Sequence, residues 1–319
     1  MSMNYSFSIV LPTYNVSEHL NRCIKSIQAQ TFIDFEMIFV DDCGVDNSID
    51  IIESHAQNDD RIKIIKHKKN LGTYHARATG VRAAVGKYLV FLDPDDEIKP
   101  DLLLRLAEKI NTSPDIIFYG VNFIPARPWY KKKAFLYADL TQETIPGSIC
   151  NKRGNEFLWG ATPGKCFRKD FYIDVLESLK IQRDFRFVYA EDQLVIYASY
   201  FQAKSVENLY YDGYIYYKND TSISRLERNK DLSLQLEQYQ YFLDKLYLTM
   251  ASQDLPISHQ VIFDRLFSYL KSNYYLISRH QSHLVDYLEC LDTSNKLDFK
   301  FRKLFAIFIY CFTFGKIRV

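Results

Sequence analysis

The first hundred residues alternate between short apolar runs and segments in which apolar residues recur at helical spacing. A short apolar run is typical of a buried strand, and helical spacing is typical of an amphipathic helix. The predicted strands are 7–11, 35–40, 61–66 and 87–92, and the predicted helices are 18–30, 48–57 and 74–84. This alternation predicts a largely parallel sheet covered by helices on both faces.

Polar residues follow three of these predicted strands. The first strand is followed by Pro-Thr-Tyr-Asn at 12–15, the second by Asp-Asp-Cys-Gly at 41–44, and the fourth by Asp-Pro-Asp-Asp at 93–96. Ligands of such sheets bind beyond the carboxyl ends of the strands. We therefore expect the three loops to converge on one ligand-binding edge.

The rest of the chain has a different pattern. Segment 115–123 predicts a further strand and 193–201 a further helix, and from about residue 226 the sequence is rich in Leu, Tyr and Gln at helical spacing. We predict an α/β domain over 1–225 and a helical C-terminal region over 226–319.

Composition narrows the function classes. The 40 basic and 39 acidic side chains give a formal net charge of +1, so the overall charge gives no reason to expect a nucleic-acid-binding protein. The six cysteines form no Cys-x-x-Cys pair, so we expect buried, reduced thiols and neither a zinc site nor a disulfide framework. No export signal precedes the first predicted strand, and we expect a cytoplasmic protein.

The C-terminal segment 296–319 combines basic flanks with a dense apolar run. The run is about half as long as the ~20 apolar residues that span a bilayer. Basic charge attracts anionic headgroups and the apolar run can lie in the interface, so the segment predicts peripheral attachment to the cytoplasmic face of the inner membrane. The alternative is a buried core helix or a homodimer contact.

Two loops carry carboxylates with candidate chemistry. Mg²⁺ and Mn²⁺ commonly take one or two protein carboxylates while substrate phosphates and water fill the other positions, so 93–96 predicts a divalent metal site that a nucleoside diphosphate would complete. Asp42 also follows a buried strand, where its carboxylate can accept hydrogen bonds from a base or a ribose hydroxyl. For both loops the alternative interpretation is an ordinary solvated turn.

Five motifs, in order and at matching spacing over about residues 5–225, resemble glycosyltransferase family 2. They are 10–15, 40–44 with Asp46 and Ser48, 70–72 with Ala76 and Arg77, 92–96, and 190–192. The resemblance implies a GT-A fold, which is a Rossmann-like α/β domain of nucleotide-diphospho-sugar transferases, with a helical C-terminal extension here.

The resemblance also implies roles for individual residues. Those implied to hold the nucleoside are Pro12, Thr13, Asn15 and Asp42, and those implied to support it or its diphosphate are Asp46 and Arg77. Asp93 and Asp95 match the metal-binding Asp-x-Asp, Asp96 would orient donor or acceptor sugar, and Lys165 would neutralise phosphate. Pro12 as a strand end, Arg77 as a structural ion pair and Lys165 as a surface lysine are the alternatives.

Asp192 matches the family's catalytic base. A carboxylate opposite the leaving diphosphate can take the proton of an acceptor hydroxyl as it attacks the anomeric carbon, which inverts the configuration. The alternative is an acidic helix N-terminus. Many relatives carry a His near the end of the domain, but 214–222 has none, so we expect metal binding to rest on the Asp-x-Asp, with Lys218 or Ser222 as candidate phosphate contacts.

Aromatic residues lie around the expected acceptor side. They are Trp129, Tyr130, Trp159, Phe187 and Tyr189. Their rings could stack on sugar rings, and the alternative is ordinary packing.

Within the family, the motifs are most similar to β-1,3-galactosyltransferases that extend bacterial lipooligosaccharide or capsular glycans. This implies UDP-galactose as donor, an oligosaccharide or glycolipid acceptor, and Mn²⁺ or Mg²⁺ as cofactor. UDP-glucose or a UDP-N-acetylhexosamine are alternative donors. Nucleotidyl transfer and a non-catalytic glycan-binding protein on this fold are the rival functions.

Overall fold

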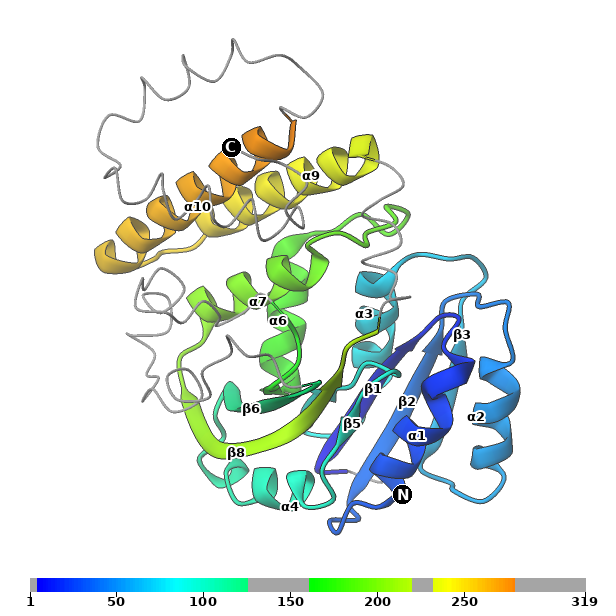
Figure 1. The fold of residues 1–319 in the computed structure, drawn as a ribbon. Coiled ribbons are helices and arrows are strands. Elements are labelled where there is room, and N and C mark those ends of the chain that lie inside the picture. Colours follow the sequence, from blue (N-terminus) through cyan, green and yellow to red (C-terminus); the bar gives the residue numbers. More distant parts are fainter. Residues whose placement is uncertain (1–4, 126–160, 220–231, 279–319) are drawn as a thin grey trace. The chain divides into compact units, whose positions relative to one another are not determined.

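The computed structural model describes residues 5–125, 161–219 and 232–278 (Figure 1). The chain divides into two compact units, Met1–Ser272 and Asn273–Val319. The candidate site and all contacts below belong to the first unit.

Among the described residues, four parallel strands form the N-terminal half of an eight-stranded sheet. They are, in spatial order, β3 (Ile62–Lys66), β2 (Phe35–Asp41), β1 (Phe7–Thr13) and β4 (Tyr88–Phe91). The register pairs Phe7 of β1 with Phe35 of β2 and Tyr88 of β4. All four strands coincide closely with predicted apolar runs. β1, β2 and β4 are buried and have few polar positions, whereas the edge strand β3 is partly exposed and carries Lys63 and Lys66.

Helices cover both faces of this half, as predicted. One face carries α1 (Ser17–Gln28) and α2 (Ser48–Ala56), whose apolar residues join Phe7 and Ile9 in one core. Helix α4 (Leu102–Ala107) adds to the same core and packs on strand β8 (Val206–Tyr217) in the other half of the sheet. The other face carries α3 (Thr73–Ala83) and α6 (Lys169–Leu179). A Cβ on Gly80 of α3 would lie 2.5 Å from Val10 Cγ1, so this glycine lets α3 approach β1 closely. Tyr172 of α6 contacts Phe91, with ring centroids 5.0 Å apart.

The other half of the sheet is mixed, which corrects the prediction of a largely parallel sheet. Its strands are β7 (Lys165–Arg168), β6 (Ile116–Ile124), β8 (Val206–Tyr217) and β5 (Glu97–Ile98). β7 is antiparallel to β4 and β6, β8 is parallel to β6, and β5 is antiparallel to β8. Of these strands the sequence predicted β6 alone. β7 and β5 are too short to give a pattern, and the pairing of β6 with β8 contains register shifts.

The remaining described elements are η1 (Ile110–Thr112), α7 (Glu191–Gln202), α9 (Leu232–Ala251) and α10 (Ile257–Ser278). The predicted boundary near residue 225 falls in 220–231, outside the described residues, and α9 packs on α6 and α7 within the first compact unit. In the described part of the chain, none of the helices combines the length and apolarity needed to cross a bilayer. Of the described cysteines, which are free thiols, Cys23 and Cys166 are buried as expected, whereas Cys43 is partly exposed.

Candidate active site

The three polar loops do converge at the carboxyl edge of the parallel strands, as predicted. Thr13 at the end of β1 pairs in register with Asp41 at the end of β2, and the backbone N–H of Asp42 donates to the Thr13 carbonyl at 2.9 Å. β4 lies on the other side of β1, with Val10 opposite Phe91, and leads into the loop that carries Asp93.

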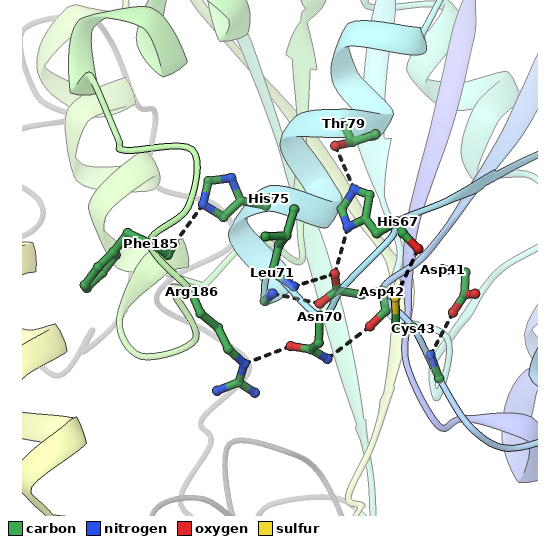
Figure 2. A network of polar contacts seen from close by, with 12 residues as sticks. Asp41, Asp42, Cys43, His67, Asn70, Leu71, His75, Thr79, Phe185 and Arg186 are labelled. Carbon is green, nitrogen blue, oxygen red and sulfur yellow. Dashed lines mark hydrogen bonds and ion pairs between the residues drawn. The ribbon is translucent and has the colours of Figure 1, made fainter.

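Asp42 holds the loop 67–72 (Figure 2). Its buried carboxylate accepts hydrogen bonds from the backbone N–H of Leu71 at 2.8 Å and of Gly72 at 2.7 Å, and from Nδ1 of His67 at 2.7 Å. The Asp42 carbonyl accepts from Nδ2 of Asn70 at 3.0 Å. An ionised carboxylate has about four acceptor positions, so one remains for a ligand.

The side chains of Asn15 and Asp46 also accept hydrogen bonds from backbone N–H groups. Asn15, at φ 51°, accepts the N–H of Val45 on its side-chain oxygen at 2.8 Å. Asp46 accepts the N–H of Ser17 at 2.8 Å and of Ser48 at 3.1 Å. Burial alone would raise the pKa of Asp46, but these hydrogen bonds hold it below its ordinary value.

The first predicted loop is close to the sheet. Pro12 lies within β1 opposite Val40, and the buried Thr13 donates its hydroxyl to the Leu11 carbonyl at 3.2 Å. The structure therefore brings Pro12, Thr13, the Asn15 loop and the Asp42 loop to one edge.

Arg77 lies at the centre of a second group of residues. It projects from α3, is 8% exposed, and donates to Asp93 Oδ1 from Nη2 at 2.8 Å and to Glu191 Oε1 from Nη1 at 3.5 Å. Burial lowers the pKa of Arg77, but the nearby charges of Asp93, Glu191 and Asp192 raise it above its ordinary value. Arg77 therefore forms the structural ion pairs that were its alternative role. These pairs join 92–96 and 190–192, two segments that the sequence predicts to be functional.

Asp95 and Asp96 are fixed by β8 and the residues that follow it. Asp95 accepts from Nδ2 of Asn219 at 3.0 Å. Asp96 is 0% exposed and accepts from the Tyr214 hydroxyl at 2.6 Å and the Tyr217 backbone N–H at 2.8 Å. Burial, followed by the charges of Asp95 and Asp93, raises the pKa of Asp96 to about 8. Its carboxylate oxygens are thus both bonded within the protein, whereas the Asp93 side chain is 30% exposed.

Asp93 and Asp95 have the donor chemistry that a hard divalent cation requires. Burial and the charge of Asp93 raise the pKa of Asp95, and a cation would relieve both effects. Among the described residues no group of three or more His, Cys, Asp or Glu side chains could hold a metal ion. Two carboxylates completed by substrate phosphates fit the usual coordination of Mg²⁺, which keeps positions for phosphate and water.

Glu191 and Asp192 are the first two residues of α7, so the helix begins earlier than the predicted 193–201. The N–H of Gln193 donates to Asp192 Oδ1 at 2.8 Å. Burial raises the pKa of both carboxyl groups, and Arg77 opposes the rise. A small cavity is lined by Arg77, Glu191 and Asp192 together with Tyr172 of α6.

Lys165 is not a surface lysine. It begins β7, is 5% exposed, and donates from Nζ to the carbonyls of Ala161 at 2.6 Å and Pro163 at 3.2 Å. Burial lowers its pKa to about 7, and the charge of Asp192 opposes this shift. Lys165 therefore lies within the electrostatic influence of Asp192 while its hydrogen bonds stabilise the turn before β7.

Several predicted residues lie outside the described residues: Trp129, Tyr130, Trp159, Ser222 and the segment 296–319. Phe187 is described and fully buried, and its ring packs against Tyr74 and Tyr241. Packing, and not sugar stacking, is therefore the role of Phe187.

Sequence reasoning missed His67, Asn219 and the pairing of Glu191 with Arg77, and it placed Asn70 in a motif without giving its side chain a role. Asn219 falls in the stretch 214–222, where relatives carry a His, so that comparison could have indicated it. His67 had no such signal, because its partners Asp42 and Thr79 are 25 and 12 positions away.

The comparisons with known proteins identify the family of the chain. The profile described as Glycosyl transferase family 2 matches residues 8–176. The chain is 30% identical over 237 residues to the uncharacterized glycosyltransferase EpsJ of Bacillus subtilis, covering 73% of this chain and 67% of EpsJ. It is 28% identical over 202 residues to the putative glycosyltransferase EpsH of the same organism, covering 62% of this chain and 57% of EpsH.

Solved structures share the fold. The crystal structure of S. aureus TarS 1-349 in complex with UDP-GlcNAc superposes with a TM-score of 0.67 at 20% identity, covering 86% of this chain and 74% of that chain. The mannosyltransferase PcManGT from Pyrobaculum calidifontis, in complex with GDP-Man and Mn²⁺, has a TM-score of 0.54 at 13% identity, covering 95% of this chain and 84% of that chain. The chain belongs to glycosyl transferase family 2 and has the GT-A fold.

Proposed function

We propose that this protein is an inverting, metal-dependent hexosyltransferase. In this proposal it transfers galactose from UDP-galactose in β-1,3 linkage to a cell-surface glycan such as lipooligosaccharide. One observation carries the catalytic part: Arg77 contacts both Asp93, of the Asp-x-Asp, and Glu191, the neighbour of Asp192. A single side chain thus links the expected diphosphate end of the site to its expected base.

Asp192 is suited to act as the base. It would take the proton of the acceptor hydroxyl while that oxygen bonds to the anomeric carbon and the bond from this carbon to the diphosphate breaks, releasing UDP. Burial raises the pKa of Asp192, which makes its carboxylate a stronger base than an exposed aspartate. Asp192 lies at a helix N-terminus, where the macrodipole favours the ionised form.

Asp93 and Asp95 would hold the divalent ion, Mn²⁺ or Mg²⁺. The ion would supply charge stabilisation for the departing diphosphate. Arg77 keeps Asp93 oriented, and Asn219 does the same for Asp95. Lys165, held by two carbonyls, adds positive charge near Asp192 when it is protonated.

The structural neighbours support a nucleotide-sugar donor but differ in the sugar. TarS 1-349 was crystallised with UDP-GlcNAc and with UDP, and PcManGT with GDP-Man and Mn²⁺. A UDP-N-acetylhexosamine, as in the TarS complex, and UDP-glucose are the alternative donors. GDP-mannose is a useful addition to any donor panel.

The donor experiment measures nucleotide release from UDP-galactose, UDP-glucose, UDP-GlcNAc and GDP-mannose with acceptor glycans, in Mn²⁺ and in EDTA. We expect metal-dependent UDP release from UDP-galactose and a β-1,3-linked product. Release from another donor would correct the sugar, and pyrophosphate in place of UDP would indicate nucleotidyl transfer. Nucleotide binding without turnover of any donor would contradict the transferase proposal.

We further propose that 296–319 attaches the protein to the cytoplasmic face of the membrane, on the sequence pattern alone. Flotation with anionic liposomes compares the full chain with a version truncated after Asn295. Loss of flotation on truncation is expected, and equal binding would contradict the proposal.

A further inference from the structure

The ring of His67 is enclosed between Asp42 and helix α3 (Figure 2). Its side chain is 8% exposed, with Nδ1 2.7 Å from Asp42 Oδ1 and Nε2 2.9 Å from the Thr79 hydroxyl oxygen. An ionised carboxylate only accepts hydrogen bonds, so Nδ1 must donate to Asp42. The Thr79 hydroxyl can donate or accept, so its hydrogen bond with Nε2 can form whether or not that nitrogen carries a proton.

The orientation of the Asp42 carboxylate decides the position of the loop 67–72. One of its oxygens accepts from both His67 and the backbone N–H of Leu71, and the other accepts from the N–H of Gly72. Two consecutive amides of the loop therefore depend on one side chain. His67 is the side-chain donor that fixes the rotation of this carboxylate.

His67 also fixes the start of the same loop. Its backbone N–H donates to the Asp41 carbonyl at 2.9 Å, and its carbonyl accepts from the Cys43 thiol at 3.0 Å. Its ring ties this point to Thr79 on α3, two residues beyond Arg77. The loop that follows β3 is thus bound to the Asp42 loop and to the helix that carries Arg77.

The end of the loop is tied to the segment that precedes α7. Asn70 donates to the Asp42 carbonyl and accepts from Nε of Arg186 at 2.8 Å. Gly72 packs so closely that an added Cβ would lie 2.7 Å from the Phe187 carbonyl oxygen. The loop therefore has little room to adapt if the Asp42 carboxylate turns away.

We propose that His67 is a positioning residue for nucleotide binding. It holds the Asp42 carboxylate, and through it the loop 67–72, in the conformation that receives the nucleoside of the donor. The inference rests on the proposed nucleotide-sugar function. Because His67 contacts neither Asp93 nor Asp192, its loss affects nucleotide affinity more than the chemical step.

The test measures the Kd of UDP by calorimetry on the full chain with Mn²⁺, together with kcat and KM. His67→Leu removes both ring hydrogen bonds, and we expect a ~10-fold or larger rise in Kd and KM, as for loss of a hydrogen bond to a charged group. We expect kcat to change little.

A matched pair of amides separates the two ring nitrogens. The shorter amide of His67→Asn can donate to Asp42 from near the position of Nδ1, whereas the longer amide of His67→Gln extends toward Thr79. We expect His67→Asn to recover most of the affinity and His67→Gln to resemble His67→Leu. If His67→Leu does not fold, the UDP affinities of His67→Asn and His67→Gln test the inference by themselves.

His55→Leu is the control, because His55 lies on α2 and its ring contacts Asn21, at 3.0 Å, rather than the Asp42 carboxylate. Its UDP affinity should equal that of the wild type. A wild-type Kd in His67→Leu, or equal losses in His67→Asn and His67→Gln, would overturn the inference while leaving the proposed function intact. If the wild-type protein bound neither UDP nor GDP, both the inference about His67 and the proposed function would be contradicted.

Discussion

The two sides of the candidate site hold their carboxylates in different ways. On the side formed by β1 and β2, Asp42 and Asp46 accept hydrogen bonds mainly from backbone N–H groups. On the side of α3 and α7, the Arg77 guanidinium pairs with Asp93 and Glu191, and its charge also acts on Asp192.

This difference has electrostatic consequences. Hydrogen bonds lower the pKa of Asp46, whereas burial raises the pKa of Glu191 and Asp192 despite Arg77. The carboxylates of the first side are held by hydrogen bonds within the protein. The second side has more negative charge than its protein partners neutralise, which is typical of a site that receives a cation or performs acid–base chemistry.

Asp192→Asn should have the largest effect, because it removes the proposed base but keeps the shape of the side chain. We expect kcat to fall by about 10²–10⁴-fold, the range for loss of general base catalysis. UDP affinity should remain unchanged, since Asp192 lies on the α7 side. UDP release and calorimetry measure the two quantities. Asp184→Asn, at an exposed aspartate, is the matched control, and full turnover in Asp192→Asn would exclude the base assignment.

Arg77→Gln should have the next largest effect. Arg77 lowers the pKa of Asp192, so its loss raises that pKa and protonates the base at higher pH. The acid limb of the kcat profile should therefore move to higher pH, and turnover at pH 7 should fall by ~10²-fold, as for loss of one electrostatic stabiliser.

Arg77→Lys keeps the positive charge and controls for the loss of packing. Its acid limb should remain nearer to that of the wild type. An identical pH profile in Arg77→Gln and the wild type would show that Arg77 does not influence the base. Melting temperatures of both variants detect the destabilisation expected when one partner of a buried ion pair is removed.

Gly72→Ala should have the smallest effect on the chemical step, because Gly72 lies in the loop 67–72 on the Asp42 side of the site. Gly72 has φ 89°, and an added Cβ would meet the Phe187 carbonyl oxygen at 2.7 Å. We expect the free energy of unfolding to fall by about 1–3 kcal/mol, the cost of a strained backbone position. Thermal melting measures it. Gly44→Ala, whose added Cβ meets neighbours at 3.2 Å or more, should cost less, and equal melting points would contradict this account.

Strands β1, β2 and β4 of the parallel half were predictable because burial on both faces leaves a nearly continuous apolar run in each of them, and the partly exposed β3 keeps apolar residues at 62, 64 and 65. β6 was predicted for the same reason, whereas β8 was not. Strand β8 is only partly buried along most of its length, and its pairing with β6 is interrupted by register shifts. Its importance comes from what it contacts, since Tyr214 and Tyr217 enclose Asp96.

The sequence by itself determined the strands that end at the ligand edge and the residue types in the loops that follow them. Strand topology then required those loops to meet, because carboxyl ends of adjacent parallel strands lie at one edge. Only the tertiary structure decided the partners: Arg77 meets Glu191 across 114 positions, and His67 lies between Asp42 and Thr79. Such pairings depend on how helices pack on the sheet, and local sequence carries no record of that packing.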